Sequence, residues 1–169
     1  MDAGLLVGRL VLGTLIAAHG AQKLLGWFGG YGLAGTGAFF DALGFRPGRA
    51  FALAAAASEI ASGSLVALGL FGPVGPAVMV SVMIVAAVSA HWHNGVFAAT
   101  NGIELPLLYA AGATELALTG PGRYSLDALL GLASIWTPGL GWIALAVGVL
   151  GGVTNLIARS HAPAAAVSA

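Results

Sequence analysis

Long apolar segments dominate the hydropathy pattern of this chain, and short stretches rich in glycine, proline and polar residues separate them. About 20 consecutive apolar residues are enough for a helix to cross the hydrocarbon core of a bilayer. Lipid cannot satisfy backbone groups, and no apolar segment alternates with the period of a β-strand, so helices are expected. The pattern predicts an all-α polytopic transmembrane bundle with spans at residues 4–25, 48–71, 75–92, 103–119 and 138–158.

Two of the connecting segments are predicted to lie at the membrane interface. The first, "GWFGGYGLAGTGAFFDALGFRPG", is rich in glycine and aromatic residues, and its Phe39, Phe40 and Leu43 share one helical face. We therefore predict an interfacial or re-entrant segment there. Residues 128–136 are too short to span a bilayer and are also predicted to lie in the interface. Residues 159–169 are predicted to form a disordered tail.

Composition supports this membrane assignment and excludes several functions. The 169 residues are 59% hydrophobic and 7% charged, whereas soluble domains average about 25% charged residues. The net charge of zero provides no basic surface for nucleic acid. The chain has no cysteine, so it cannot itself carry out thiolate or disulfide chemistry or ligate a cluster through cysteine. We therefore expect an integral membrane protein.

The first predicted helix carries three nitrogen bases, Arg9, His19 and Lys23. Projected at about 100° per residue, these bases share one stripe with Gly13 and Gly20, and the opposite side of the helix is mainly apolar. Glycines allow helices to approach closely in membranes. The stripe is therefore predicted to face protein rather than lipid.

Acidic residues on two other helices provide possible partners. Glu59 lies in a face of small residues on the second helix, and Glu104 and Glu115 lie about 20° apart in projection on the fourth. An unpaired charge at the centre of a bilayer costs at least roughly 2.5–3.5 kcal/mol. Because the first and fourth helices run antiparallel, Arg9 and Glu115 lie at the same depth, and we predict a buried ion pair between them. Glu59 is predicted to lie within about two turns of Arg9 and His19.

The distribution of basic residues predicts the orientation in the membrane. Lys23, Arg46 and Arg49 fall in or beside the first loop, and Arg159 follows the last span. With five spans, a cytoplasmic first loop places these four bases inside, as the positive-inside rule favours. The N-terminus is then outside and the C-terminus inside.

Several ordered motifs resemble the DoxX family of small bacterial membrane proteins. They are "R…G…HGAQKL" in the first helix, "SEIASGSLVALGLF" in the second, and "HWHNGVFAATNGIELPLLYAAGATELALTGPGRYSLD" through the fourth. The resemblance covers residues 4–127 and implies a four-helix core at 1–127 in the bacterial plasma membrane. The helix at 138–158, within the added segment 128–158, is a departure from the family pattern. The recurrent polar and turn positions of the family fall on Arg9, His19, Gly20, Lys23, Glu59, Glu104, Gly120, Pro121, Gly122 and Asp127.

This resemblance also implies a role beside redox enzymes, because the family includes the DoxD-type subunit of thiosulfate:quinone oxidoreductase and mycobacterial proteins associated with membrane redox complexes. We predict a site for a quinone or a similar molecule. His19 and Lys23 would donate hydrogen bonds to the ligand, and Glu59 with His19 would transfer protons. Trp27 and Trp92 would flank the ring. No haem, flavin or nicotinamide motif is present, so electrons would come from partner redox subunits, and quinone would be a non-covalent cofactor.

Other interpretations of these residues remain open. Buried ion pairs often serve only to fix helix register. The two histidines of "HWH" project apart on a helix, so no metal site is predicted. Two alternative functions are a small-molecule transporter and a non-catalytic scaffold of a membrane complex. No inverted repeat, which many transporters have, is visible in the sequence. A homo-oligomer is compatible with each of these functions.

Overall fold

The computed structural model describes residues 2–159, which are largely helical and contain no β-strand. Three single helices are long and apolar enough to cross a membrane: α1 (Asp2–Leu25), α3 (Gly48–Leu68) and α7 (Pro138–Ile157). The fourth such segment is α4 (Val74–Ala86) together with the short helical turns that continue it to Asn94. The prediction of an all-α polytopic membrane bundle is confirmed. Residues 160–169 of the predicted tail lie outside the described residues.

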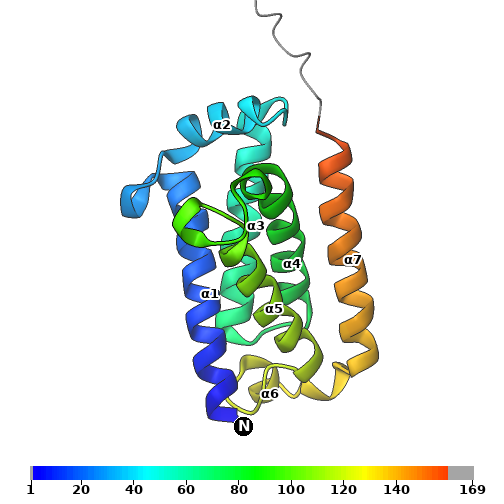
Figure 1. Ribbon diagram of the computed structural model, residues 1–169. Coiled ribbons are helices and arrows are strands. Elements are labelled where there is room, and N and C mark those ends of the chain that lie inside the picture. Colours follow the sequence, from blue (N-terminus) through cyan, green and yellow to red (C-terminus); the bar gives the residue numbers. More distant parts are fainter. Residues whose placement is uncertain (1, 160–169) are drawn as a thin grey trace, which may run out of the picture.

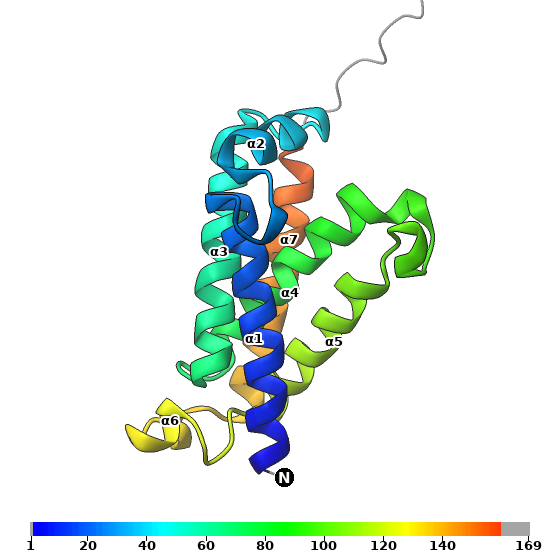
Figure 2. The same cartoon turned by 90° about the vertical axis from the view of Figure 1, so that its left-hand side faces the viewer.

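The helices run alternately up and down between two ends of the bundle (Figure 1). Helix α2 (Gly32–Ala42) lies across the end at which α1 finishes and α3 begins, which we call the α2 end. Helix α6 (Leu126–Leu129) lies at the opposite end, the α6 end, near the start of α1. Helix α5 (Glu104–Thr119) returns from α4 toward the α6 end, and α7 then runs back to the α2 end (Figure 2). The chain therefore enters α1 and leaves α7 at opposite ends, as predicted.

Glycines bring α1 and α3 into close contact. A Cβ atom on Gly13 would lie 2.5 Å from the backbone oxygen of Gly63, and one on Gly20 would lie 2.7 Å from that of Ala56. Any larger residue at these two glycines would force the helices apart. Much of the predicted protein-facing stripe of α1 is confirmed, because Arg9, Gly13 and Gly20 are buried and Lys23 is half-buried. His19 of the same stripe is exposed, which differs from the prediction.

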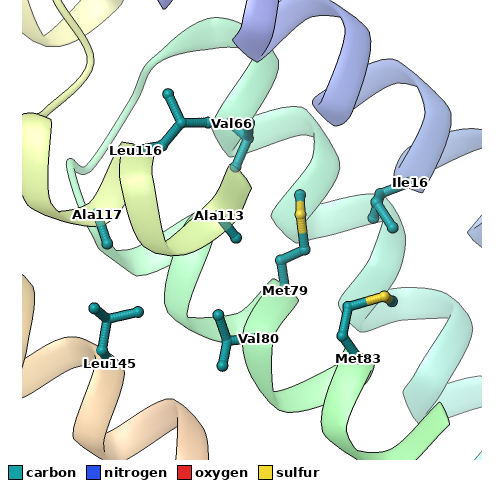
Figure 3. Close-up of a cluster of buried hydrophobic side chains, with 9 residues drawn as sticks. All are labelled: Ile16, Val66, Met79, Val80, Met83, Ala113, Leu116, Ala117 and Leu145. Atoms are coloured by element: carbon teal, nitrogen blue, oxygen red, sulfur yellow. The ribbon is translucent and has the colours of Figure 1, made fainter. Parts of the chain in front are cut away.

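Helix α7 packs into the same hydrophobic core as the helices before it. Its Leu145 belongs to a buried cluster to which α1, α3, α4 and α5 also contribute (Figure 3). A Cβ atom on Gly148 would lie 2.3 Å from the backbone oxygen of Ala77, so α7 lies directly against α4. The cluster consists of Ile16, Val66, Met79, Val80, Met83, Ala113, Leu116, Ala117 and Leu145.

Helix α5 differs most from its prediction. Its 16 residues extend about 24 Å at 1.5 Å per residue, which is less than the ~30 Å hydrocarbon core. Glu115, on its predicted buried face, is exposed. The hairpin of α4 and α5 leans away from α1 and α3 toward its connecting segment (Figure 2), so α5 packs mainly on α4 and only lightly on α1. The residues that α5 buries are Pro106, Ala113, Leu116 and Ala117.

Candidate functional site

A buried ion pair joins α1 to α3 near the α2 end. The Nζ atom of Lys23 donates to Oε1 and to Oε2 of Glu59, at 2.6 Å each. Glu59 is only 3% exposed, and this is the single salt bridge within residues 2–159. An ammonium group has three N–H donors. Two contacts to the carboxylate therefore leave Lys23 one donor for a ligand.

Lys23 and Glu59 both line a large cleft with a volume of about 620 Å³. This volume is within the range of small-molecule sites, roughly 300–1,000 Å³. Helix α4 packs against both α3 and α7, so α4 forms the floor of the cleft and the other two helices form its sides. The α2 end of the cleft is covered by four phenylalanines and one leucine, which we call the aromatic roof: Phe39, Phe40, Leu43, Phe45 and Phe51.

The remainder of the cleft wall is mostly apolar, with a few polar groups. Ser58 and Ser81 provide hydroxyls. The amide of Asn155 also lines the cleft and donates to the carbonyl of Gly151 within α7. Because Lys23 neutralises the carboxylate of Glu59, the pair presents no large net charge to a ligand. Such a wall suits an apolar molecule with one neutral hydrogen-bonding group.

The other predicted ligand-binding residues lie outside this cleft. His19 is exposed on α1, where its Nδ1 lies 3.0 Å from Oε1 of Gln22 and its ring meets the edge of Tyr109 on α5. Trp27 and Trp92 are 59% and 62% exposed. The structure thus brings Lys23 and Glu59 together in the cleft wall, and it places His19, Trp27 and Trp92 elsewhere. His19 faces α5 because it lies about 100° around α1 from Gly20, the residue that packs directly against α3.

The predicted ion pair between Arg9 and Glu115 is wrong. Arg9 is buried, its Nη2 donates to the carbonyl of Tyr124, and its Nε and Nη1 have no hydrogen-bond partner within the described residues. Glu115 is exposed on α5. Because α1 packs closely on α3 and only lightly on α5, Arg9 faces the segment that folds beneath the α6 end instead of the acid on α5.

Asp127 anchors that segment at the α6 end. Its fully buried carboxylate accepts from the backbone N–H of Phe71 at 2.9 Å and from that of Gly72 at 2.6 Å. It thereby ties the segment after α5 to the turn between α3 and α4. Ser125 caps α6 by accepting from the backbone N–H of Ala128.

The remaining family positions hold loops in place. Gly120 and Gly122 have φ angles of 79° and 74°, which favour glycine. Pro121 lines a small cavity beside Arg9. Glu104 accepts from the backbone N–H of Ala98 at 2.7 Å and so closes the loop before α5.

The long apolar helices and the ion pair buried between two of them define a multi-pass integral membrane protein. A sequence model of the DoxX family matches residues 4–92, which contain α1 to α4 together with Lys23 and Glu59. Since the match covers more than half of the 169 residues, the chain belongs to the DoxX family. No curated protein and no solved structure matches it significantly.

Sequence reasoning did not find the roof of the cleft or the wall that α7 provides. The shared helical face of Phe39, Phe40 and Leu43 was a signal for the roof, because all three residues line the cleft. For α7 the signal was the spacing of Gly141, Leu145, Gly148 and Gly152, which places these residues on one face, and that face is buried. A stripe of small residues on a membrane helix indicates close helix packing.

Proposed function

We propose that the cleft binds a quinone or a similar lipid-soluble molecule, and that the protein is a subunit of a membrane redox system. The observation that carries this proposal is the Lys23–Glu59 pair in the wall of a cleft of about 620 Å³ that is otherwise mostly apolar. A quinone has a flat apolar ring and neutral carbonyl acceptors. These features match the aromatic roof and the third donor of Lys23.

The residues of the cleft would act on the ligand by orientation and proton transfer. Lys23 would donate to one quinone carbonyl. Glu59 would first take up a proton from water and then pass it to the quinone oxygen on which negative charge develops. Reduction of a quinone to a quinol takes two electrons and two protons. The electrons would come from a partner redox subunit, because the sequence carries no haem, flavin or nicotinamide motif of its own. We place the complex in the bacterial plasma membrane.

Binding of a short-tailed radiolabelled benzoquinone to the full chain in nanodiscs tests this function. Ala55 lines the cleft, whereas Ala57, two residues along the same helix, is exposed and does not. Ala55→Phe should weaken binding by about tenfold or more, as overpacking of a formed site does. Ala57→Phe and His19→Ala should bind as the unchanged protein does. Absence of saturable binding, or an equal effect of the two phenylalanines, would overturn the proposal.

Turnover separates a redox subunit from a scaffold. Glu59→Gln should lower the quinone-dependent turnover of the co-purified complex while the complex still assembles. If turnover and assembly are both unaffected by Glu59→Gln and by Ala55→Phe, the protein acts only as a scaffold. Flux of a solute into liposomes that contain this chain alone would instead indicate a transporter.

A further inference from the structure

The residues that line the cleft extend over several helical turns of α4 and α7. Along α4 and the turns that continue it, lining residues extend from Val74 to His91. At 1.5 Å per residue this distance is about 25 Å, close to the thickness of the hydrocarbon core. On α7 the lining residues extend in parallel from Ala144 to Asn155. The cleft therefore follows the direction of lipid tails in a bilayer.

The size of the cleft limits what can occupy it. Its volume of about 620 Å³ lies within the roughly 300–1,000 Å³ of small-molecule sites. Because the lining follows α4 for about 25 Å, an elongated ligand with a hydrocarbon tail suits the cleft better than a compact one.

The two halves of the cleft differ in chemistry. The α2 end contains the aromatic roof and, just below it, Lys23 and Glu59. The half toward the α6 end is lined by small aliphatic groups, among them Val74, Ala77 and Ala144. Polar and aromatic ligand groups match the first half, and a saturated or isoprenoid tail matches the second.

The cleft is closed at the α2 end and open at its side. The Nε atom of Arg159 donates to the backbone carbonyl of Leu43, and this bond ties the end of α7 to the roof. Ala54 of α3 and Val147 of α7 line the cleft and are nevertheless exposed, Val147 to 63%. The opening between α3 and α7 therefore faces the side of the bundle, where lipid lies, rather than the water at the α2 end.

We infer that the cleft binds a long-tailed lipid whose head group lies against Lys23, Glu59 and the roof, and whose single linear tail extends along α4 toward Val74. The ligand enters sideways from the bilayer between α3 and α7. The identity of the head group as a quinone rests on the proposed function. The position and direction of the tail do not rest on the proposed function, because a lipid acyl chain has the same linear hydrocarbon chemistry as the tail of a quinone.

Photolabelling of the full chain in nanodiscs maps the tail directly. One probe is a benzoquinone with a long alkyl tail and a diazirine at the terminal carbon, and the other is a fatty acid with the same tail. We expect the diazirine to modify residues 74–78 and 144–148. Ala144→Phe should lower this labelling by about tenfold because it fills the lower cleft. Ala146→Phe should not, since Ala146 is exposed and does not line the cleft.

The outcomes distinguish this inference from the proposed function. Labelling at residues 39–45 would reverse the direction of the tail and overturn the inference. Labelling spread over the outer face of α7, unchanged by Ala144→Phe, would overturn the tail site itself. If the short-tailed benzoquinone binds but neither tail probe labels the lower cleft, the proposed function stands and this inference fails. If the fatty acid labels the lower cleft and no quinone binds, the tail site stands and the proposed function fails.

Discussion

At the residue scale, the buried carboxylates of Glu59 and Asp127, at opposite ends of the bundle, are satisfied in different ways. At the α2 end, the charges of Lys23 and Glu59 neutralise each other. At the α6 end, the carboxylate of Asp127 accepts two backbone N–H bonds, one on each oxygen. Hydrogen bonds to a charged group are stronger than those between neutral groups, and a buried donor without a partner is costly. Asp127 therefore stabilises the turn between α3 and α4.

Asp127→Asn tests this role. The amide keeps one acceptor and turns an N–H group toward a backbone donor, so we expect a loss of about 1–3 kcal/mol in the free energy of unfolding. Thermal unfolding in detergent micelles should show a lower melting temperature. Asp41→Asn is the matched control, because Asp41 is exposed and accepts only one bond, from the N–H of Gly48 to Oδ1. Equal melting temperatures for the two variants would contradict the role of Asp127.

At the scale of elements, the contact between α1 and α3 is the most extensive in the described part of the bundle and depends on backbone rather than on side chains. Gly13 and Gly63 each point at the other's carbonyl oxygen, and an added Cβ would lie within 2.5 Å of it. Lipid provides no hydrophobic force that would pull the helices together, so close backbone packing must hold them. This contact also sets the spacing at which Lys23 reaches Glu59.

Gly13→Ala should disturb this contact. A new methyl group against backbone cannot be accommodated by a rotamer change, and overpacking typically costs about 1–3 kcal/mol. We expect a lower melting temperature and a lower yield of folded protein from the membrane. Gly8→Ala on the same helix is the control, since nothing lies within 4 Å of its added Cβ, and alanine favours a helix by about 1 kcal/mol. If Gly13→Ala is as stable as Gly8→Ala, α1 and α3 do not pack as described.

At the scale of the whole molecule, basic residues are concentrated at the α2 end. Lys23, Arg46 and Arg49 lie in or beside the segment that holds α2, and Arg159 bonds to Leu43 in the same region. The positive-inside rule therefore predicts that the α2 end is cytoplasmic.

Cysteine labelling in intact cells tests the orientation, and the native chain contributes no cysteine of its own. Ala34 at the α2 end and Ser134 at the α6 end are both exposed. A membrane-impermeant maleimide should label Ser134→Cys from outside and should label Ala34→Cys only after the cells are opened. The reverse pattern would show that the protein has the opposite orientation, and labelling of both from outside would rule out an odd number of crossings.

The sequence by itself determined the spans formed by α1, α3, α4 and α7, and the buried faces of α1 and α3. Both follow from local rules, because apolar length sets a span and the 3.6-residue repeat places glycines and polar groups on one side of a helix. Within the candidate site, Lys23 and Glu59 could be named in advance for the same reason. The buried face of α5 could not be predicted in this way. Glu104 and Glu115 share one side of the helix by periodicity, whether or not that side packs against a neighbouring helix.

Only the tertiary structure decided which charges meet and where a ligand fits. Arg9 lies near Tyr124 rather than Glu115, and Glu59 bonds to Lys23 rather than to His19. These choices depend on which helices are neighbours and on the tilt of the hairpin of α4 and α5. The cleft depends on the packing of α7 on α4 and on the roof formed by α2, the loop after it and the first turn of α3. A helical repeat fixes the direction of a side chain on its own helix, whereas a contact between helices depends on the relative positions of both.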